Sequence, residues 1–149
     1  MNSQFLHVGM TVADIDRTIE FYTKYFNFTL EHKAVFSEKF IGSKKQLYKM
    51  PDGAFSDFCF LKSPDGYIIE AFQFHPQVPF EEAVWNRPGY THICLRVDDI
   101  FEAYEKMKAD GVEFYFAPEE RGGPNAHWVF LKDPDGNMIE LQDEKAHEA

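Results

Sequence analysis

The chain of 149 residues has few cysteines, no long apolar run and no clustered positive charge. Its two cysteines, Cys59 and Cys94, allow one disulfide at most, and both lie in apolar strand-like runs that favour reduced, buried thiols. No run approaches the roughly 18 apolar residues that a membrane span needs. The first residues also lack the basic and long apolar regions of a signal peptide. We therefore expect a soluble, cytoplasmic protein that has no membrane partner.

Positive charge is also scarce, since the formal net charge is −10 and lysine and arginine form no stripe. Nucleic-acid binding requires concentrated positive charge to neutralise phosphates, so we expect no nucleic-acid partner. The sequence has no Gly-x-Ser-x-Gly elbow, no P-loop and no Gly-x-Gly-x-x-Gly after a strand. Hydrophobic residues make up 44% of the chain, which is typical of a globular protein. The 16 phenylalanines and 7 tyrosines indicate an aromatic-lined core or pocket.

The clearest feature that is present is a strand motif that occurs twice. Residues 64–71 read PDGYIIEA, and residues 134–141 read PDGNMIEL, 70 positions later. Pro-Asp-Gly predicts a turn, because proline fixes φ and glycine accepts the positive φ that other residues resist. A short apolar strand follows, in which Glu70 and Glu140 stand where a hydrophobic residue is expected. A carboxylate repeated in a repeated strand predicts a site built from two halves.

A second repeat places a histidine on the first strand of each half. Residues 5–12 and 90–97 both alternate as strands do, with His7 and His92 on the less apolar face. The two histidines are 85 positions apart, and each strand is followed by a helical pattern. Two copies with so long a period do not indicate a solenoid. They predict two related modules arranged as a pseudo-twofold pair.

Helix signals follow both of these strands. Asp14 is a candidate N-cap for an amphipathic helix over residues 15–26. Asp99, with Glu102 three residues on, resembles a capping box for a second helix that should stop at Gly111.

The remaining periodic segments predict strands and loops. Residues 37–43 are expected to form a loop, residues 121–124 a mobile loop, and residues from 144 onward a tail. The order common to both halves is strand, helix and then three strands. The other predicted strands span residues 28–36, 45–50, 55–61, 68–74, 113–116, 126–131 and 137–142.

The modules are expected to form one domain over residues 1–149. Module 1 spans residues 4–75 and module 2 spans residues 90–143. Residues 76–89 contain three prolines and break the periodicity, so they are the predicted linker.

The four repeated side chains His7, Glu70, His92 and Glu140 form a candidate metal set. Two imidazoles and two carboxylates suit a divalent transition metal and leave coordination positions open for water or substrate. A lone histidine or glutamate on a strand is more often structural or solvated, but recurrence at equivalent places in two copies favours a site. A Lewis acid there would stabilise an enolate or alkoxide oxygen, and a displaceable carboxylate can move a proton.

Other side chains have weaker patterns behind them. Phe72 and Phe74 share a strand face with Glu70, which fits either a pocket lining or plain core packing. Arg121 and the two glycines after it could cradle an anion, but a flexible loop is the simpler interpretation. The histidines without a counterpart in the other half, for which we expect surface or structural roles, are His32, His75, His127 and His147. The candidate substrate-pocket residues are Phe72, Phe74, Arg96 and Trp128.

From residue 5 to residue 142 the sequence resembles the vicinal oxygen chelate superfamily, which includes glyoxalase I, epimerases, extradiol dioxygenases and bleomycin and fosfomycin resistance proteins. The resemblance is carried by HVGMTVAD at residues 7–14, by Phe21-Tyr22, by both Pro-Asp-Gly strands and by residues 92–99. It implies an α+β fold in which two βαβββ modules form a curved eight-stranded mixed sheet around a metal. It also implies a homodimer, in which the modules pair either within a chain or across chains.

The resemblance is greatest to glyoxalase I-like members, also called lactoylglutathione lyase-like. It implies that His7, Glu70, His92 and Glu140 bind one divalent ion (Ni, Co, Zn, Mn or Fe), with Glu140 as the base and Glu70 as the second catalytic carboxylate. The implied activity is that of a lyase or isomerase which moves a proton next to a carbonyl of a small molecule through a metal-stabilised enediolate. The alternatives are a binding protein of the bleomycin or fosfomycin resistance type, an epimerase and an extradiol dioxygenase.

Two positions depart from the pattern of bacterial glyoxalase I. Thr11 stands where that family has an arginine four residues after the first histidine, although Arg96 holds the matching place in the second half. Phe74 stands where an asparagine follows the first glutamate ligand by four residues. The sequence therefore leaves open whether glutathione is the thiol.

Overall fold

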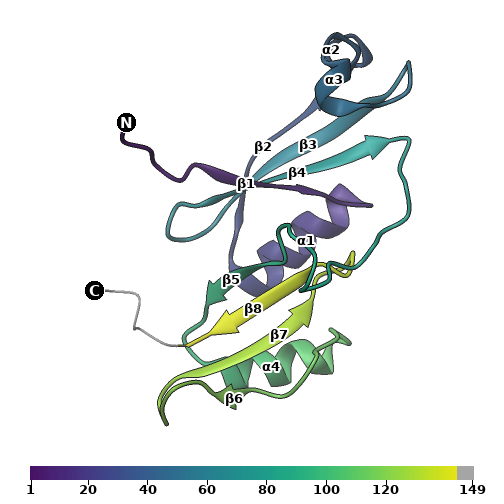
Figure 1. Ribbon diagram of the computed structural model, residues 1–149. Coiled ribbons are helices and arrows are strands. Elements are labelled where there is room, and N and C mark those ends of the chain that lie inside the picture. Colours follow the sequence, from purple (N-terminus) through teal and green to yellow (C-terminus); the bar gives the residue numbers. More distant parts are fainter. Residues whose placement is uncertain (144–149) are drawn as a thin grey trace. The chain divides into compact units, whose positions relative to one another are not determined.

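The computed structural model describes residues 1–143 and groups the chain into two compact units, which divide between Pro79 and Phe80 (Figure 1). That division lies within the predicted linker, residues 76–89. The tail predicted from residue 144 onward, which includes His147, lies outside the described residues.

Unit 1 is a four-stranded mixed sheet with one long helix. The strand order is β1-β4-β3-β2, with β1 parallel to β4 and the other neighbours antiparallel. Its elements are β1 (His7–Thr11), α1 (Ile15–Phe26), β2 (Thr29–Phe36), α2 (Glu38–Ser43), α3 (Lys45–Tyr48), β3 (Phe55–Lys62) and β4 (Ile68–His75).

Unit 2 repeats this topology, with strand order β5-β8-β7-β6 and β5 parallel to β8. Its elements are β5 (His92–Arg96), α4 (Ile100–Ala109), β6 (Glu119–Glu120), β7 (His127–Lys132) and β8 (Met138–Gln142). The predicted α+β class and the two βαβββ modules are thus confirmed. Within residues 1–143, no helix combines the length and the apolar character that a membrane span requires.

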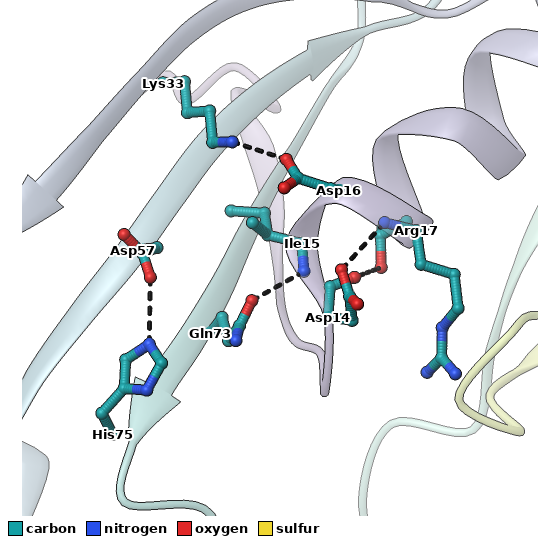
Figure 2. Close-up of polar contacts among 9 residues, drawn as sticks. Asp14, Ile15, Asp16, Arg17, Lys33, Asp57, Gln73 and His75 are labelled. Carbon is teal, nitrogen blue, oxygen red and sulfur yellow. Dashed lines mark hydrogen bonds and ion pairs between the residues drawn. The ribbon is translucent and has the colours of Figure 1, made fainter.

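The helix predicted over residues 15–26 forms with those bounds because both of its ends are capped. The Asp14 carboxylate accepts a hydrogen bond from Arg17 N at 3.0 Å, and the Gln73 side-chain oxygen accepts one from Ile15 N at 2.8 Å (Figure 2). These contacts satisfy amide groups that the first helical turn leaves without partners. At the other end, Asn27 adopts a left-handed conformation with φ of 55° and closes the helix.

The second predicted helix is also confirmed. Asp99 Oδ1 accepts hydrogen bonds from Phe101 N and Glu102 N, both at 3.0 Å. The helix ends at Ala109, and Gly111 follows with φ of +90°. The predicted start and stop signals therefore act where the sequence places them.

Two predictions between β2 and β3 were wrong. Residues 37–43 were expected to be a loop and residues 45–50 a strand, but the structure has the short helices α2 and α3 there. Ser37 Oγ caps α2 by accepting a hydrogen bond from Phe40 N at 3.1 Å, and Lys49 ends α3 with φ of 51°. Most side chains here are unbranched, which favours a helical turn, and only Ile41 of the two helices is buried.

The strand predicted over residues 113–116 was also wrong. Phe114 forms a single bridge with Leu131, and the strand that pairs with β7 is the two-residue β6. Pro118 lies directly before β6 and has no N–H to donate, so it interrupts a regular ladder at this edge.

One face of each sheet packs against a helix and forms the core. In unit 1 the buried side chains include Tyr22 of α1, Leu61 of β3 and Ile69 of β4. In unit 2 they include Leu131 of β7 and Ile139 of β8. The opposite face of each sheet carries the histidine and the glutamate, because side chains alternate along a strand.

The two cysteines are both free, but they differ in exposure. Cys59 is buried, as predicted, and faces the helix. Cys94 is exposed, and the prediction that it is buried was wrong. It shares its strand face with His92, whereas the more buried side chains of β5, Ile93 and Leu95, face the other way.

Candidate functional site

In unit 1 the first predicted histidine and glutamate lie beside each other. His7 and Glu70 come from the parallel neighbours β1 and β4, where Gly9 stands directly opposite Glu70. His7 lies two residues before Gly9 and therefore on the same face. The distance from His7 Nε2 to Glu70 Oε2 is 2.9 Å, with the histidine side chain 39% exposed and the glutamate side chain 14% exposed.

Unit 2 builds the second pair in the same way. Cys94 on β5 stands opposite Glu140 on β8, and His92 lies two residues before Cys94. The distance from His92 Nε2 to Glu140 Oε2 is 3.1 Å. The glutamate side chain is 9% exposed and the histidine side chain 25% exposed, so this pair is less exposed than that of unit 1.

The parallel ladder thus brings together each histidine with the glutamate of its own half. Each pair supplies one imidazole nitrogen and one carboxylate oxygen, so the donor atoms present fit a divalent transition ion. Over residues 1–143, neither unit holds a group of three or more His, Cys, Asp or Glu side chains placed to share a metal ion. The four-ligand site that uses both pairs therefore stays a prediction.

Glu140 is the centre of a polar cluster that the sequence did not predict. Its Oε1 accepts a hydrogen bond from Gln142 Nε2 at 2.7 Å and lies 3.4 Å from Arg121 Nη1. Gln142 could have been found by strand alternation, because it lies two residues after Glu140 on the same face. Arg121 could not, since it comes from the turn between β6 and β7 and no periodic pattern places it near Glu140.

The histidine of unit 2 has an outer partner as well. Thr91 Oγ1 lies 2.8 Å from His92 Nδ1. When Nδ1 carries the proton and donates it to this hydroxyl, Nε2 keeps its lone pair on the side of Glu140. Contacts of this kind orient a metal-binding imidazole and fix its tautomer.

The thiol of Cys94 lies next to the same carboxylate. Loss of solvation around the thiol, together with the charge of Glu140 and a hydrogen bond to it, raises the pKa of Cys94 to about 12. Cys94 is exposed as a whole residue, so this loss concerns the immediate surroundings of the sulfur rather than the residue as a unit. The thiol therefore stays protonated at neutral pH and can donate a hydrogen bond to Glu140.

Aromatic rings lie beside the glutamate of unit 1 on the same sheet face. Phe60 stands opposite Glu70 across the β3–β4 ladder, and Phe58 stands opposite Phe72. The rings of Phe72 and Phe74 lie 5.9 Å apart, and both are half-buried. The structure thus places both predicted pocket residues of β4 in an aromatic sheet face that begins beside Glu70. A substrate-binding role for them stays a prediction.

The pair of unit 2 also has aromatic neighbours. The ring centroid of His92 lies 4.9 Å from that of Phe130 and 5.3 Å from that of Trp85. The ring centroid of Trp128 lies 5.8 Å from that of Phe130. Arg96 is exposed on β5, and its register partner on β8 is Gln142. Both predicted pocket residues therefore belong to the sheet face that carries His92 and Glu140.

Two of the histidines without a counterpart in the other half, His75 and His127, pair with aspartates instead. His75 Nε2 pairs with Asp57 Oδ2 at 2.9 Å, as Figure 2 shows, and His127 Nδ1 pairs with Asp143 Oδ2 at 2.9 Å. These contacts fit the structural roles expected from the sequence. The exposed His32 packs its ring near those of Phe58 and Phe60.

Comparison with protein families gives a match over nearly the whole chain. The family model described as the Glyoxalase/Bleomycin resistance protein/Dioxygenase superfamily matches residues 4–141. A probable lactoylglutathione lyase from Vibrio cholerae is 31% identical over 147 residues, which cover 98% of this chain and 95% of that protein.

Two solved structures are similar in fold. A glyoxalase family protein from Bacillus cereus has a TM-score of 0.78 at 22% identity, covering 95% of this chain and 94% of that one. A fosfomycin resistance protein from Listeria monocytogenes, determined with Mn(II) and a sulfate ion, has a TM-score of 0.67 at 21% identity. The match covers 99% of this chain and 98% of that protein.

Proposed function

The chain belongs to the glyoxalase/bleomycin resistance protein/dioxygenase superfamily, and from this membership we propose that it is a divalent-metal-dependent lyase or isomerase that moves a proton next to a carbonyl. The observation that carries the proposal is the doubled pair, with His7 beside Glu70 at 2.9 Å and His92 beside Glu140 at 3.1 Å. Its support from relatives is the lactoylglutathione lyase name of the Vibrio cholerae protein.

In this proposal His7, Glu70, His92 and Glu140 hold one divalent ion, which is Ni, Co, Zn, Mn or Fe. A bound ion would act as a Lewis acid toward the oxygen of the substrate carbonyl. The imidazoles bind as neutral donors, and the Thr91 hydroxyl, 2.8 Å from His92 Nδ1, can accept the proton that Nδ1 carries in that state. Glu70 and Glu140 supply the negative charge that balances the cation.

Glu140 is the base in this proposal. In a thiol adduct of a 2-oxoaldehyde it takes the proton from the carbon that bears the hydroxyl and the sulfur and returns it to the former carbonyl carbon, while the hydroxyl proton passes to the former carbonyl oxygen, so the reaction is an isomerisation. In a 2-substituted acyl thioester it returns the proton to the same carbon, which is an epimerisation. Its side chain is 9% exposed, and Phe130 lies beside it, which limits access of water to the transferred proton. Glu70 is the second carboxylate that can exchange a proton with the substrate.

The substrate class proposed is a small adduct of a thiol with a 2-oxoaldehyde, or a 2-substituted acyl thioester. Thr11 and Phe74 replace two polar residues that the resemblance to glyoxalase I would place near glutathione, so thiols other than glutathione belong in the assay. The aromatic face beside Glu70 fits a thiol with an apolar body.

A second candidate is a binding or resistance protein that sequesters an aromatic small molecule without chemistry. The observation that favours it is the same aromatic face, in which the rings of Phe36 and Phe58 stack at 4.2 Å. The similar fold of the fosfomycin resistance protein is compatible with it. Both proposals expect a small-molecule ligand, and for both we propose a cytoplasmic homodimer.

Metal analysis followed by a proton-exchange assay tests the first proposal. The purified protein is loaded with Ni, Co, Zn, Mn or Fe in turn, and bound metal is measured by elemental analysis after desalting. Near-stoichiometric metal is expected, together with deuterium uptake next to the carbonyl of a turned-over substrate. A protein that binds an aromatic ligand but retains none of these metals would instead favour the second candidate.

A further inference from the structure

The two glutamates of the site, Glu70 and Glu140, differ in the side chains that contact their carboxylate oxygens. Glu140 Oε1 accepts a hydrogen bond from Gln142 Nε2 at 2.7 Å and lies 3.4 Å from Arg121 Nη1, while Oε2 faces His92 at 3.1 Å. Glu70 Oε2 faces His7 in the same way, at 2.9 Å. Within unit 1 as described, no other side chain donates a hydrogen bond to Glu70. The Oε1 atom of Glu140 is therefore fixed by polar contacts with side chains of unit 2.

Strand geometry places Gln142 beside Glu140. The two residues are separated by one position on β8, so their side chains share a face. Gln142 is 5% exposed, and its carbonyl oxygen accepts a hydrogen bond from Val97 N at 2.8 Å, which fixes its backbone to the end of β5. A carboxylate can only accept, so the amide NH2 is the group that faces it.

The corresponding position in unit 1 is Phe72, two residues after Glu70. Its ring contacts other rings and has no hydrogen-bond donor. The difference between the two glutamates thus follows from this position of the repeated strand and from Arg121, which lies in the turn between β6 and β7. The thiol of Cys94 adds to it, because Cys94 is the register partner of Glu140 and hydrogen-bonds to it, whereas the partner of Glu70 is Gly9.

We propose that Gln142 is a positioning residue for Glu140, in an inference that rests on the function proposed above. By holding Oε1, its amide keeps Oε2 directed toward His92 and toward the ion that the pair would bind. The torsion that turns a glutamate carboxylate is broad, so without this contact the carboxylate would sample many orientations. Arg121 supports the same oxygen from the exposed turn, at the longer distance.

A variant that removes only the donor tests this role. Gln142→Met keeps an unbranched side chain of similar length, and its affinity for Zn(II) and Co(II) is measured by competition with a chromogenic chelator. Loss of an outer partner typically costs about 10- to 100-fold in metal affinity, and we expect a loss in that range. The visible absorption of the Co(II) form should also change, because the orientation of one ligand changes. With a turned-over substrate, kcat should fall more than KM rises.

Two further variants separate positioning from general damage. Gln77→Met removes another glutamine amide, one that donates to Ala13 O at 2.8 Å in unit 1, and should leave metal affinity unchanged. Arg121→Met acts at a side chain that is 49% exposed and should fold even if Gln142→Met does not. We expect it to weaken metal binding in the same direction by a smaller factor.

A double-mutant cycle shows whether the effect passes through Glu140. In a Glu140→Gln background, Gln142→Met should change metal affinity by less than about twofold, because the carboxylate that it positions is gone. A purely structural role of Gln142 would give the same loss in both backgrounds, and that result would overturn the proposal.

Two other outcomes would refute either the positioning role of Gln142 or the proposed function. A folded Gln142→Met protein with unchanged metal affinity and an unchanged Co(II) spectrum would refute the positioning role while leaving the proposed function standing. A parent protein that binds no divalent ion would overturn the proposed function, and the positioning role with it. The first of these results requires a metal-loaded parent, so the two failures are distinguishable.

Discussion

Phe60 stands directly across the β3–β4 ladder from Glu70, in the register position that Phe130 holds against Glu140 across the β7–β8 ladder. Residues opposite each other on neighbouring strands share a face and pack together. Each carboxylate of the site therefore has an aromatic ring beside it and a histidine on the next strand. The repeat thus includes, besides the proposed ligands, the phenylalanine that limits the access of water to one side of each glutamate.

Loss of one histidine should release the proposed metal. In His92→Ala one nitrogen donor is removed, so we expect metal affinity to fall by more than the roughly 10- to 100-fold that loss of an outer partner costs. His127→Ala is the matched control in the same unit, because His127 pairs with Asp143 at 2.9 Å instead. Chelator competition checks both variants, and equally tight binding by His92→Ala would remove it from the ligand set.

The core should tolerate truncation poorly on the helix-facing side of either sheet. Leu131 on β7 is fully buried, so Leu131→Ala should lower the free energy of unfolding by about 2–5 kcal/mol through lost burial and a cavity. Leu47 on α3 is 71% exposed, and Leu47→Ala should change stability by less than about 0.5 kcal/mol. Urea unfolding measures both. Similar losses for the two variants would contradict the placement of the core.

The sequence predicted those parts of the fold that repeat or carry strong local signals. The caps Asp14 and Asp99 fix the starts of both helices, and the Pro-Asp-Gly turns precede β4 and β8. Each His–Glu pair could be predicted because alternation and a parallel ladder suffice to put the two residues on one face. In contrast, α2 and α3 are too short for a period to emerge.

Contacts that depend on the path of a turn were beyond the sequence. Arg121 reaches Glu140 from the turn between β6 and β7, where two glycines and Pro124 leave no periodic pattern. Cys94 was predicted to be buried because its strand is apolar overall, yet alternation turns it to the face of His92. With Cys94 on that face, its contact with Glu140 could have been predicted, because the two residues are register partners.

The buried carboxyl group of Asp133 should make stability depend on pH. Burial raises its pKa above the ordinary value of 3.8, although hydrogen bonds from Asn137 and Asp135 N act in the opposite direction. The folded state then holds the proton more tightly than the unfolded state. The stability that Asp133 contributes is therefore fully present below the unfolded pKa and is lost as the pH rises through the raised folded pKa.

The variant Asp133→Ser tests the direction of this pH dependence, with serine chosen because it occupies the equivalent position of the repeat in unit 1. Ser63 holds the same place in unit 1, where its Oγ accepts a hydrogen bond from Tyr67 N at 2.9 Å. We expect the stability of the parent relative to Asp133→Ser to decrease as the pH rises from about 4 to 7. Urea unfolding across that range checks it, with Leu131→Ala as a control whose difference should not vary with pH. An advantage of the parent that grows with pH would show the opposite sign.

We also expect the protein to be a homodimer. The segment around the predicted linker carries exposed apolar side chains that a second copy would cover, namely Val78, Phe80, Val84, Trp85 and Tyr90. Light scattering across a range of concentrations should give twice the mass of one chain. A monomer at every concentration would rule the dimer out.

Replacement of the proposed base should separate metal binding from proton transfer. Glu140→Gln keeps the shape of the side chain and an oxygen that can face His92, so metal should still bind, with reduced affinity. The amide cannot take a proton from carbon. General acid–base catalysis contributes about 10²- to 10⁴-fold in rate, and turnover should fall by a factor in that range.

The decisive measurement is deuterium incorporation at the carbon next to the carbonyl. Hemithioacetals of several thiols and 2-substituted acyl thioesters are screened first with the parent protein, and the variant is then assayed with a substrate that the parent turns over. Glu102→Gln on α4 is the control, because Glu102 belongs to the helix and its backbone N–H is held by Asp99. Exchange should fall in Glu140→Gln and persist in Glu102→Gln. Undiminished exchange in a metal-loaded Glu140→Gln protein would show that another group transfers the proton. Glu70 is the first alternative to test, because it faces His7 as Glu140 faces His92.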